Sequence, residues 1–420
     1  MEQYNSYKDS GVEWIGEVPS HWNICKLKHL SHIFGRIGFR GYNQTDLVGE
    51  GEGAITLSPS NMQNGKMNYD KCSYLSWYKY NESPEIKIYD GDILFVKTGS
   101  TFGKVSYVAN LPMEATINPQ IVVFKNIKGS NKYLYYLLSN EIVQRQVSLT
   151  VGGSTIPTLS QENILNYVVP VAPKEEQDAI ASYLDKKCSE IDNVISAQQK
   201  RIALLQELKQ SVITHAVTKG LDPNVEMKDS GVEWIGKVPA HWELIRTRYL
   251  CNLCTGNKDT INRVEDGKYP FYVRSPKIER INTYSFDGEA ILMAGDGVGA
   301  GKVFHYVKGK FDYHQRVYNF HNFKRVIGKF FFHYIANNFR YIIEEGGAKN
   351  TVDSVRLYMI QNFLMTVPTI EEQYKICEYI ERKEIAFDTA ISNAQHQVEL
   401  LQEYKQCLIT EVVTGKRKVS

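Results

Sequence analysis

Basic, amide and hydroxyl side chains gather in two glycine-bearing segments of the first half of the chain, and these side chains suit contacts with DNA. They are Arg36, Arg40, Asn43 and Gln44 in GRIGFRGYNQ, followed by Lys97, Thr98, Ser100 and Lys104 in VKTGSTFGK. Arg, Asn and Gln can form paired hydrogen bonds with base edges, whereas Lys and Ser suit phosphate oxygens. We predict that the set contains several DNA contacts; for any single member, an ordinary solvated surface position is the alternative.

Similar side chains recur in the second half of the chain, again close to glycine. They are Asn257, Lys258, Arg274, Ser275, Lys277, Lys302, His314, Gln315 and Arg316. Polar side chains in loops carry specificity more often than the scaffold that holds them. The second half is therefore predicted to contact DNA in the same manner as the first, but through different residues.

Two motifs that would indicate nucleotide or methyl-transfer chemistry are incomplete. The segment GDGVGAGK at 295–302 fails the phosphate-loop pattern twice, because Asp296 occupies the first glycine position and Val303 follows the lysine. A turn between two strands is the favoured interpretation. The segment Asn-Pro-Gln at 118–120 is the nearest approach to an Asn-Pro-Pro-aromatic tetrapeptide, and it lacks the second proline and the aromatic residue.

Metal and nuclease patterns are equally weak. Cys251 and Cys254 form a lone CxxC pair with no second pair at zinc-ligand spacing. Asp70, Glu85 and Lys87 could form an acidic and E-x-K nuclease arrangement, but such triplets arise by chance in a chain with 49 Lys and Arg and 47 Asp and Glu. We therefore predict no catalytic residues, no metal site and no cofactor bound by this chain.

Short strands separated by Gly, Asn, Asp and Pro turns are predicted to position the polar loops. In the first half they are Gly53–Leu57, Ile86–Ile88, Asp92–Lys97, Lys104–Val108 and Ile121–Lys125. In the second half they are Phe271–Val273, Ala290–Ala294, Lys302–Val307 and Arg316–Phe320. One amphipathic helix is predicted in each half, at Lys132–Leu149 and at Phe330–Glu345.

The two halves are an internal repeat. The segment KDSGVEWIGEVPSHW at 8–22 returns as KDSGVEWIGKVPAHW at 228–242, with 13 of 15 positions identical, and we call it the lead motif. Its tryptophans are expected to anchor each copy in a core. DGDILFVKTGSTFGKV at 90–105 corresponds to DGEAILMAGDGVGAGKV at 287–303, and GGST at 152–155 corresponds to GGAK at 346–349. The loops between these landmarks have diverged.

Each half ends in a long segment without Pro or Gly, at 175–218 and 371–414, and 20 of 44 positions are identical between them. Both show an apolar seam with heptad spacing, so two long helices are predicted to pair with each other. The seam consists of Leu184, Ile191, Ile195, Ile202, Leu205, Val212, Ile380, Phe387, Ile391, Val398, Leu401 and Leu408. Antiparallel pairing, which would give a pseudo-two-fold axis, is favoured. Gly220 and Pro223 provide a helix stop, and an insertion near Gly220 is expected to change the spacing of the two halves.

These elements predict an α+β fold with two mixed globular regions and a paired-helix spacer. The boundaries are a first globular domain at 1–172, a first helix at 173–226, a second globular domain at 227–368 and a second helix at 369–420. The globular segments 23–172 and 243–368 carry net charges of +3 and +6, whereas each helical segment carries −2. That distribution favours a polyanion on the globular parts.

Composition indicates an intracellular, cytoplasmic protein without a membrane segment. No apolar run approaches the about 18 residues of a spanning helix, and the first residues do not form a signal peptide. Seven cysteines without a dense pattern agree with a reducing compartment.

The motifs that close each half resemble those of the specificity subunits of type I restriction-modification enzymes. The resemblance rests on GVEWIGxVPxHW, on PKEEQ at 173–177 and PTIEEQ at 368–373, and on LLQE-x-K-Q-x-x-I-T in both helices. It implies two target recognition domains, each reading one half of a split, asymmetric DNA site. It also implies that the paired helices set the half-site spacing and dock two modification subunits, to which restriction subunits are added. S-adenosylmethionine, ATP and Mg²⁺ would then be bound by those partners, which would methylate adenine and cleave DNA. Glu384 departs from the apolar seam.

Two other interpretations stay open. The chain could be the specificity subunit of a different methyltransferase or restriction effector. It could also be a coiled-coil scaffold that spaces two protein-binding domains and does not bind DNA, although the basic globular regions argue against that.

Overall fold

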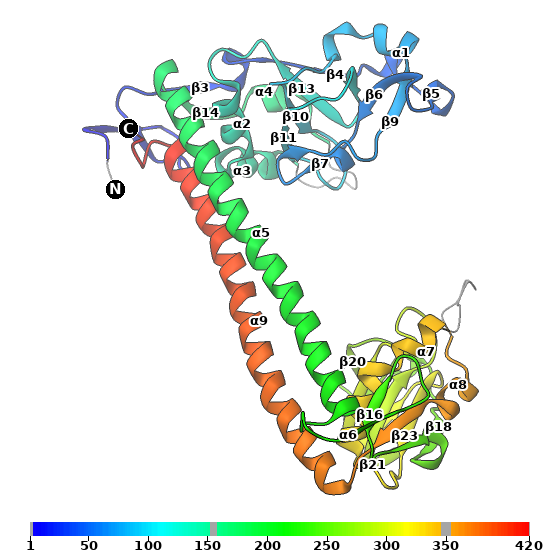
Figure 1. Cartoon of the computed structure of the whole chain (residues 1–420). Coiled ribbons are helices and arrows are strands. Elements are labelled where there is room, and N and C mark those ends of the chain that lie inside the picture. Colours follow the sequence, from blue (N-terminus) through cyan, green and yellow to red (C-terminus); the bar gives the residue numbers. More distant parts are fainter. Residues whose placement is uncertain (1–2, 152–157, 346–353, 420) are drawn as a thin grey trace. The chain divides into compact units, whose positions relative to one another are not determined.

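The computed structural model describes residues 3–151, 158–345 and 354–419, and it divides into two compact units. Unit 1 comprises residues 1–197 and 397–420, and unit 2 comprises residues 198–396. The boundaries fall inside the two long helices, α5 (Lys174–Lys219) and α9 (Ile370–Val413), which Figure 1 shows in green and in orange to red. The compact units therefore differ from the four consecutive blocks predicted from the sequence, because each unit takes the first part of one long helix and the last part of the other.

The two long helices match the predicted segments to within one residue at each end. The start of α5 and the end of α9 lie in unit 1, whereas the end of α5 and the start of α9 lie in unit 2, so the pairing is antiparallel. Each unit contains six of the predicted seam residues, and all twelve are buried or half-buried. The three-four spacing of apolar residues thus places a continuous apolar stripe on each helix.

Lysine interrupts the seam once in each unit, at equivalent positions of α5 and α9. In unit 2 the Lys209 Nζ lies 2.9 Å from Asp388 and 3.8 Å from Glu384. Burial raises the pKa of Glu384, although Lys209 opposes the shift. In unit 1 the Lys405 Nζ lies 2.6 Å from Asp192. These pairs explain how the polar seam positions are accommodated, including the departure at Glu384.

The main sheet of unit 1 has six strands in the order β4-β13-β10-β11-β8-β7. Its strands are β4 (His32–Gly35), β7 (Met62–Gln63), β8 (Lys66–Met67), β10 (Ile93–Val96), β11 (Val105–Tyr107) and β13 (Ile121–Lys125). A four-stranded sheet in the order β12-β6-β9-β5 lies in the same unit. It contains β5 (Leu47–Val48), β6 (Gly53–Leu57), β9 (Ser73–Ser76) and β12 (Ala115–Ile117). The helices of this unit are α1 (Trp77–Asn81), α2 (Asn131–Ser139), α3 (Glu141–Thr150) and α4 (Gln161–Leu165).

The main sheet of unit 2 has the order β18-β23-β21-β22-β19-β20. Its strands are β18 (Asn252–Thr255), β19 (Tyr269–Tyr272), β20 (Ile278–Ile281), β21 (Phe286–Ala294), β22 (Phe304–Tyr313) and β23 (Val317–His321). The helices are α6 (Gly328–Asn338), α7 (Arg340–Glu345) and α8 (Leu357–Asn362). The first four strands follow the same order as in unit 1, and the next strand, β8 or β19, runs parallel to its neighbour in both units. The repeat seen in the sequence is therefore a repeat of sheet topology.

A strand pair closes each globular region. In unit 1, β3 (Asn23–Lys26) pairs with β14 (Val168–Val171), and in unit 2, β17 (Glu243–Arg246) pairs with β24 (Leu364–Val367). Short 3-10 helices occur between the strands. They are η1 (Leu27–His29), η2 (Gly38–Arg40), η3 (Gln44–Asp46), η4 (Pro59–Asn61), η5 (Pro84–Ile86), η6 (Thr247–Tyr249) and η7 (Thr260–Asn262).

Most predicted strands are present, and two kinds of prediction were wrong. The predicted strand Ile86–Ile88 is occupied by η5 and a single bridge from Ile88 to Ala115, because Pro84 fixes a backbone angle that suits a helical turn. The predicted helix Lys132–Leu149 is two helices. Asn140 is extended between them, and its side chain accepts a hydrogen bond from the Ile142 amide to cap α3.

The predicted helix Phe330–Glu345 is likewise divided into α6 and α7, at Phe339. The related segments 152–155 and 346–349 lie outside the described residues.

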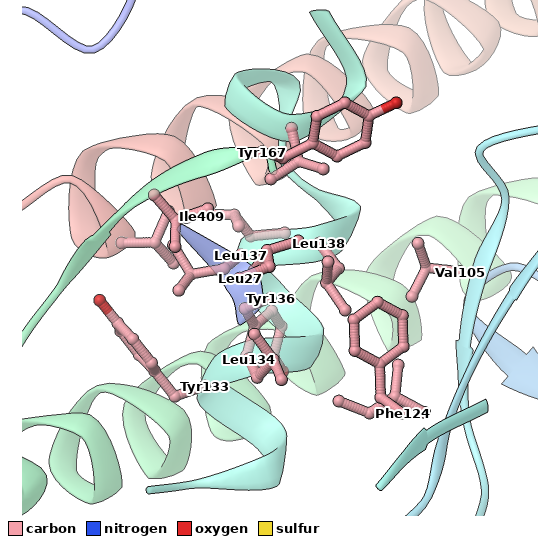
Figure 2. Close-up of a cluster of buried hydrophobic side chains, with 14 of the residues drawn as sticks. Leu27, Val105, Phe124, Tyr133, Leu134, Tyr136, Leu137, Leu138, Tyr167 and Ile409 are labelled. Carbon is pink, nitrogen blue, oxygen red and sulfur yellow. The ribbon is translucent and has the colours of Figure 1, made fainter. Parts of the chain in front are cut away.

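The main core of unit 1 joins its sheet to both long helices. Figure 2 shows Phe124 and Val105 from the sheet facing Leu134, Leu137 and other α2 side chains, and α9 contributes Ile409 to the same cluster. Unit 2 repeats this plan, with α6 side chains packed between its sheet and the two helices. The globular regions are therefore built onto the helix pair through continuous apolar cores.

The lead motif forms a hairpin that attaches each globular region to the ends of both helices. The strands are β1 (Tyr7–Asp9) with β2 (Glu17–Pro19) in unit 1 and β15 (Met227–Asp229) with β16 (Lys237–Pro239) in unit 2. Trp22 and Trp242 are buried, as expected for anchors. The Trp22 indole donates to Glu176 at the start of α5 at 2.9 Å, and Trp242 donates to Glu372 at the start of α9 at 3.3 Å.

Candidate nucleic-acid interface

The polar loop at 97–104 in unit 1 connects β10 to β11 as a tight glycine turn. The Gly103 amide donates to the Val96 carbonyl at 2.8 Å, and Gly99 and Gly103 have φ of +104° and +82°. Residues that carry a side chain rarely adopt such positive backbone angles, so glycine at these two positions permits the turn. The Lys97 amide and carbonyl bond to Gln120 and Leu159, both at 2.8 Å, which ties the loop to two other segments.

The loop at 295–303 in unit 2 makes the same backbone hydrogen bonds. The Gly301 amide donates to the Ala294 carbonyl, and the Gly295 amide and carbonyl bond to Arg316 and Val355, all at 2.8 Å. The glycine-rich segment is therefore a turn between β21 and β22, which confirms the interpretation favoured over a phosphate loop. The same scaffold carries different side chains in the two units.

A second turn lies beside each glycine turn, and it is also shared. In unit 1 the Asn118 Oδ1 accepts from the Gln120 amide at 3.0 Å. In unit 2 the His314 Nδ1 accepts from the Arg316 amide at 2.9 Å. Burial lowers the pKa of His314, and a neutral imidazole can accept this hydrogen bond. An amide in one unit and an imidazole in the other thus perform the same structural task.

In unit 1 the loops surround an open depression of about 420 Å³. Its polar lining includes Ser58, Ser60, Gln63, Ser100, Lys104 and Gln120. Two members of the predicted DNA-binding set, Ser100 and Lys104, therefore share one depression. Hydroxyl, amide and ammonium groups around an open hollow can donate hydrogen bonds to phosphate oxygens and to base edges.

In unit 2 an acidic residue organises the basic side chains. The Arg274 Nη1 lies 3.1 Å from Asp296, and the Arg316 Nε lies 3.7 Å from the same carboxylate. The Gln315 Nε2 donates to Asp259 at 2.8 Å. The ion pairs with Asp296 restrict the rotamers of the two arginines, and the hydrogen bond to Asp259 orients the Gln315 amide.

Not every predicted DNA-binding residue lies at an accessible position. The Arg36 side chain is 5% exposed, and its guanidinium donates to the Ile117 and Arg40 carbonyls and to the Thr116 hydroxyl. The sequence argument assumed a surface loop, whereas the end of β4 turns this arginine inward to satisfy buried carbonyl groups. His314 is also buried, with 3% exposure, so it supports the turn instead of reaching outward.

The remaining members lie in loops at the surface or half-buried. Arg40 forms an ion pair with Glu85 at 3.3 Å, Asn43 caps η3, and Gln44 is exposed beside it. Thr98 and Lys97 are half-buried in the glycine turn. In unit 2, Asn257, Lys277 and Lys302 are exposed, Lys258 is half-buried, and the Ser275 hydroxyl donates to the Lys277 carbonyl. Contact with DNA stays a prediction for these residues.

Sequence reasoning missed four residues that organise the loops, which are Asn118, Gln120, Asp259 and Asp296. The order Asn-Pro-Gln was noted only as an incomplete catalytic motif, and Asp296 only as a missing glycine. An offset of 196 does align Asn118 with His314 and Gln120 with Arg316, but all ten residues of the segment 114–123 differ from those at 310–319.

The residues considered for metal or nuclease chemistry have separate structural partners. Glu85 pairs with Arg40, and the Lys87 ammonium donates to Asn81 at 2.7 Å. Cys251 is buried, and Cys254 contacts the Tyr313 hydroxyl. Over the described ranges, no three His, Cys, Asp or Glu side chains cluster as metal ligands would, and no helix is long and apolar enough to cross a membrane.

The fold and these loops define a class of protein with two globular regions of equivalent topology and an antiparallel helix pair. Comparison with known proteins places the chain within that class. The family described as type I restriction modification DNA specificity domain matches residues 41–204 and again 239–400. The chain therefore belongs to this family.

Individual relatives agree with that assignment. The putative type I restriction enzyme MjaX specificity subunit of Methanocaldococcus jannaschii is 22% identical, and the match covers 96% of each chain. The type I restriction enzyme EcoDI specificity subunit of Escherichia coli is 26% identical over 43% of this chain and 40% of the relative. A solved chain, from work on complex assembly and conformational transition of the type I R-M system, has a TM-score of 0.71. That match covers 95% of this chain and 99% of the solved chain at 13% identity, so it shows a shared fold.

Proposed function

We propose that this chain is the DNA specificity subunit of a type I restriction-modification complex, in which each unit reads one half of a split, asymmetric target. The observation that carries the proposal is the duplicated loop scaffold. The same backbone hydrogen bonds hold 97–104 and 295–303, while the side chains they present differ. A constant scaffold with variable loop residues is how one architecture can read two different sequences.

Under this proposal the chain recognises DNA and does not catalyse a reaction. The sequence contains no complete methyltransferase, phosphate-loop or nuclease motif. Adenine methylation and DNA cleavage would be carried out by modification and restriction subunits, which would bind S-adenosylmethionine, ATP and Mg²⁺. We expect the complex to act in the cytoplasm, where its double-stranded DNA target is found.

Two modification subunits would dock on the paired helices. The last part of each long helix carries an exposed apolar pair, spaced by four residues so that it lies on a single helix face. In unit 2 the pair is Leu204 and Leu208, with 64% and 52% exposure, and in unit 1 it is Leu400 and Tyr404, both with 49% exposure. The pairs are related by the helix offset of 196, so the same surface occurs twice and supports two copies of one partner.

The function is tested by sequencing methylated sites in the host with and without this chain. We expect one split motif with two different half-sites to disappear when the chain is removed. The purified chain, free of partner subunits, should methylate and cleave nothing. Methylation by the isolated chain would contradict the non-catalytic role.

Affinity measurements separate the remaining possibilities. Binding of the assembled complex to DNA should weaken steeply with rising salt, because phosphate contacts release counterions. A DNA affinity that changes with neither salt concentration nor DNA sequence would favour the interpretation that the chain is a protein-binding scaffold. Co-purification with an effector other than modification and restriction subunits would assign the chain to a different system.

A further inference from the structure

Gln120 in unit 1 and Arg316 in unit 2 occupy the same position in the duplicated scaffold. The carbonyl of each residue accepts a 2.8 Å hydrogen bond from the first residue of the glycine turn, Lys97 or Gly295. The amide of each residue donates to the side chain two positions earlier, Asn118 or His314. Both main-chain polar groups are thus occupied in the same way, so the two units differ at this position only in the side chain that they present.

Both side chains are accessible and held in place by neighbours. Gln120 is exposed and lines the depression of unit 1, where its Oε1 accepts from the Asn118 Nδ2 at 3.0 Å. The Arg316 side chain is 67% exposed, and its ion pair with Asp296 restrains the guanidinium. A side chain that is oriented before binding loses less conformational entropy when it meets a ligand.

We infer that this position reads a base directly, with Gln120 recognising adenine and Arg316 recognising guanine at equivalent places in the two half-sites. The inference rests on the proposed function and adds the residues and the bases. The carboxamide of Gln can donate to N7 and accept from N6 of adenine, whereas the fork of Arg donates to both O6 and N7 of guanine. Asn118 and His314 are positioning residues, because their side chains hold the turn.

Neighbouring side chains fit other tasks. The Lys277 side chain is 76% exposed, and a single ammonium on a flexible stem suits a phosphate better than a base pair. Val298 is 91% exposed at the tip of the glycine turn, but it has no polar group that could distinguish base edges by hydrogen bonding. Arg274 is held by Asp296 through a direct 3.1 Å hydrogen bond. Arg316 therefore combines exposure, restraint and paired donors.

The test compares Arg316→Gln, Arg316→Lys and Gln120→Arg in the complete complex with its modification subunits, read out by sequencing methylated sites. Arg316→Gln should relax or exchange one guanine in the half-site read by unit 2, with discrimination at that base falling about 5-fold to 100-fold. Arg316→Lys keeps the charge and loses the fork, so it should also lose discrimination there. Gln120→Arg should change one adenine in the other half-site only.

Lys277→Gln is the matched control, because it removes a cation from the same region. It should lower methylation at all sites alike without altering the motif. A thermal unfolding midpoint equal to that of the wild-type protein shows that each variant has folded.

If the Arg316→Gln complex methylated the same motif but less at every site, the inference would be overturned, because loss of a phosphate contact has that effect. Changes in both half-sites would overturn it too. If the wild-type complex methylated no split site at all, the proposed function itself would fail.

Discussion

At the scale of single residues, the two units fill one structural role with different chemistry. Asn118 and His314 each accept a hydrogen bond from the amide two residues ahead, and each lies next to an exposed polar side chain. A turn of this kind needs an acceptor at a fixed distance from the backbone, and both side chains supply it. The identity of the acceptor can therefore vary while the backbone path stays the same.

His314→Asn should be tolerated, and His314→Ala should not. Asparagine supplies the acceptor that unit 1 already uses, whereas alanine leaves the Arg316 amide without its partner. We expect His314→Ala to lower the free energy of unfolding by about 0.5–1.5 kcal/mol and His314→Asn to lower it by less. Urea unfolding of both variants measures this, with Lys277→Ala as the exposed control. If both variants lost the same free energy of unfolding, the hydrogen bond from the Arg316 amide would not contribute to stability.

His333 should make unit 2 sensitive to acid. Burial in α6, together with Lys329 on the same helix and Lys209 on α5, lowers the pKa of His333 to about 4. Glu381 and Glu384 of α9 provide the carboxylates near these lysines. Because the unfolded chain binds the proton more tightly, stability is complete above pH 6.5 and falls as the pH drops from 6.5 towards 4.

At about pH 4, protonation of His333 should have lowered the free energy of unfolding by about 3 kcal/mol. Thermal unfolding between pH 7 and pH 4.5 measures it, and His333→Gln, which does not titrate, should flatten the profile. Lys132 of α2 and Lys329 of α6 pair with corresponding carboxylates of the long helices, Asp185 and Glu381. Tyr136 lies four residues after Lys132, as His333 lies four residues after Lys329, and tyrosine does not titrate in this range. If His333→Gln lost stability with falling pH as the wild-type protein does, the acid sensitivity would come from other groups.

At the scale of elements, each lead motif meets the end of the helix that arrives from the other half of the sequence. Gly415, just beyond α9, lies against Pro19 and Trp22 in unit 1, and Gly220, just beyond α5, lies against Trp242 in unit 2. Both glycines have positive φ, of +72° and +80°. Glycine ends the helix and at the same time allows the hairpin to approach it closely.

Gly415→Ala should therefore destabilise unit 1 more than Gly11→Ala. Both positions have φ above +70°, so both substitutions incur about 1–2 kcal/mol of backbone strain. Only at Gly415 would the new Cβ lie 2.3 Å from Pro19, whereas nothing lies within 4 Å at Gly11. We expect a total loss of roughly 2–5 kcal/mol for Gly415→Ala, measured by thermal unfolding. Equal effects of the two substitutions would show that the hairpin can move away.

At the scale of the whole molecule, the two long helices belong to both units, and each globular region is closed by its own strand pair. Glu243 pairs with Val367 where the second globular region begins and ends. The two covalent connections of that region to its flanking helices therefore leave it side by side. The arrangement predicts that a reading region can be exchanged without altering the other.

Replacing residues 243–368 by the corresponding region of a relative should change one half-site and leave the other half-site intact. The donor should retain the contacts that join this region to the helices, such as Thr366 to the Val217 carbonyl and Gln210 to Asn337. Sequencing the methylated sites of the chimera measures the outcome. Changes in both halves would contradict independent reading.

Helix length should determine the gap between the half-sites. The sequence favours Gly220 as an insertion point, but Gly220 lies against Trp242, and the preceding Lys219 donates to the Ile235 and Lys237 carbonyls. One extra heptad after Ala197 and another after His396 would instead preserve the seam in both helices and lengthen each by about 10 Å.

We expect such a double insertion to leave both half-site sequences unchanged and to lengthen the gap by about three base pairs of ~3.4 Å each. Three base pairs also rotate the second half-site by about 100°, so affinity should fall as well. Sequencing methylated sites measures the gap, and a single insertion in α5 is the control that disrupts the seam. A longer helix pair with an unchanged gap would show that spacing is determined elsewhere.

The sequence by itself determined the elements whose signals are local. Heptad spacing located both long helices to within a residue, because a periodic apolar stripe must be buried along its whole length. Duplicated motifs established the internal repeat, and the closing motifs indicated the family that the comparison confirmed. Strands such as Gly53–Leu57 and Ile121–Lys125 were also predicted with their observed bounds.

Only the tertiary structure decided which loop residues are equivalent, which face outward and how the chain divides into units. Arg36 was expected at the surface, but it bonds to Thr116 and Ile117, about 80 residues further along the chain. The correspondence of Gln120 with Arg316 depends on backbone hydrogen bonds between distant segments. Such bonds cannot be predicted from the types of the side chains. The long helices are split between units because each globular core recruits side chains from both of them. Contacts of this kind depend on how elements pack in space, which periodicity and local composition do not specify.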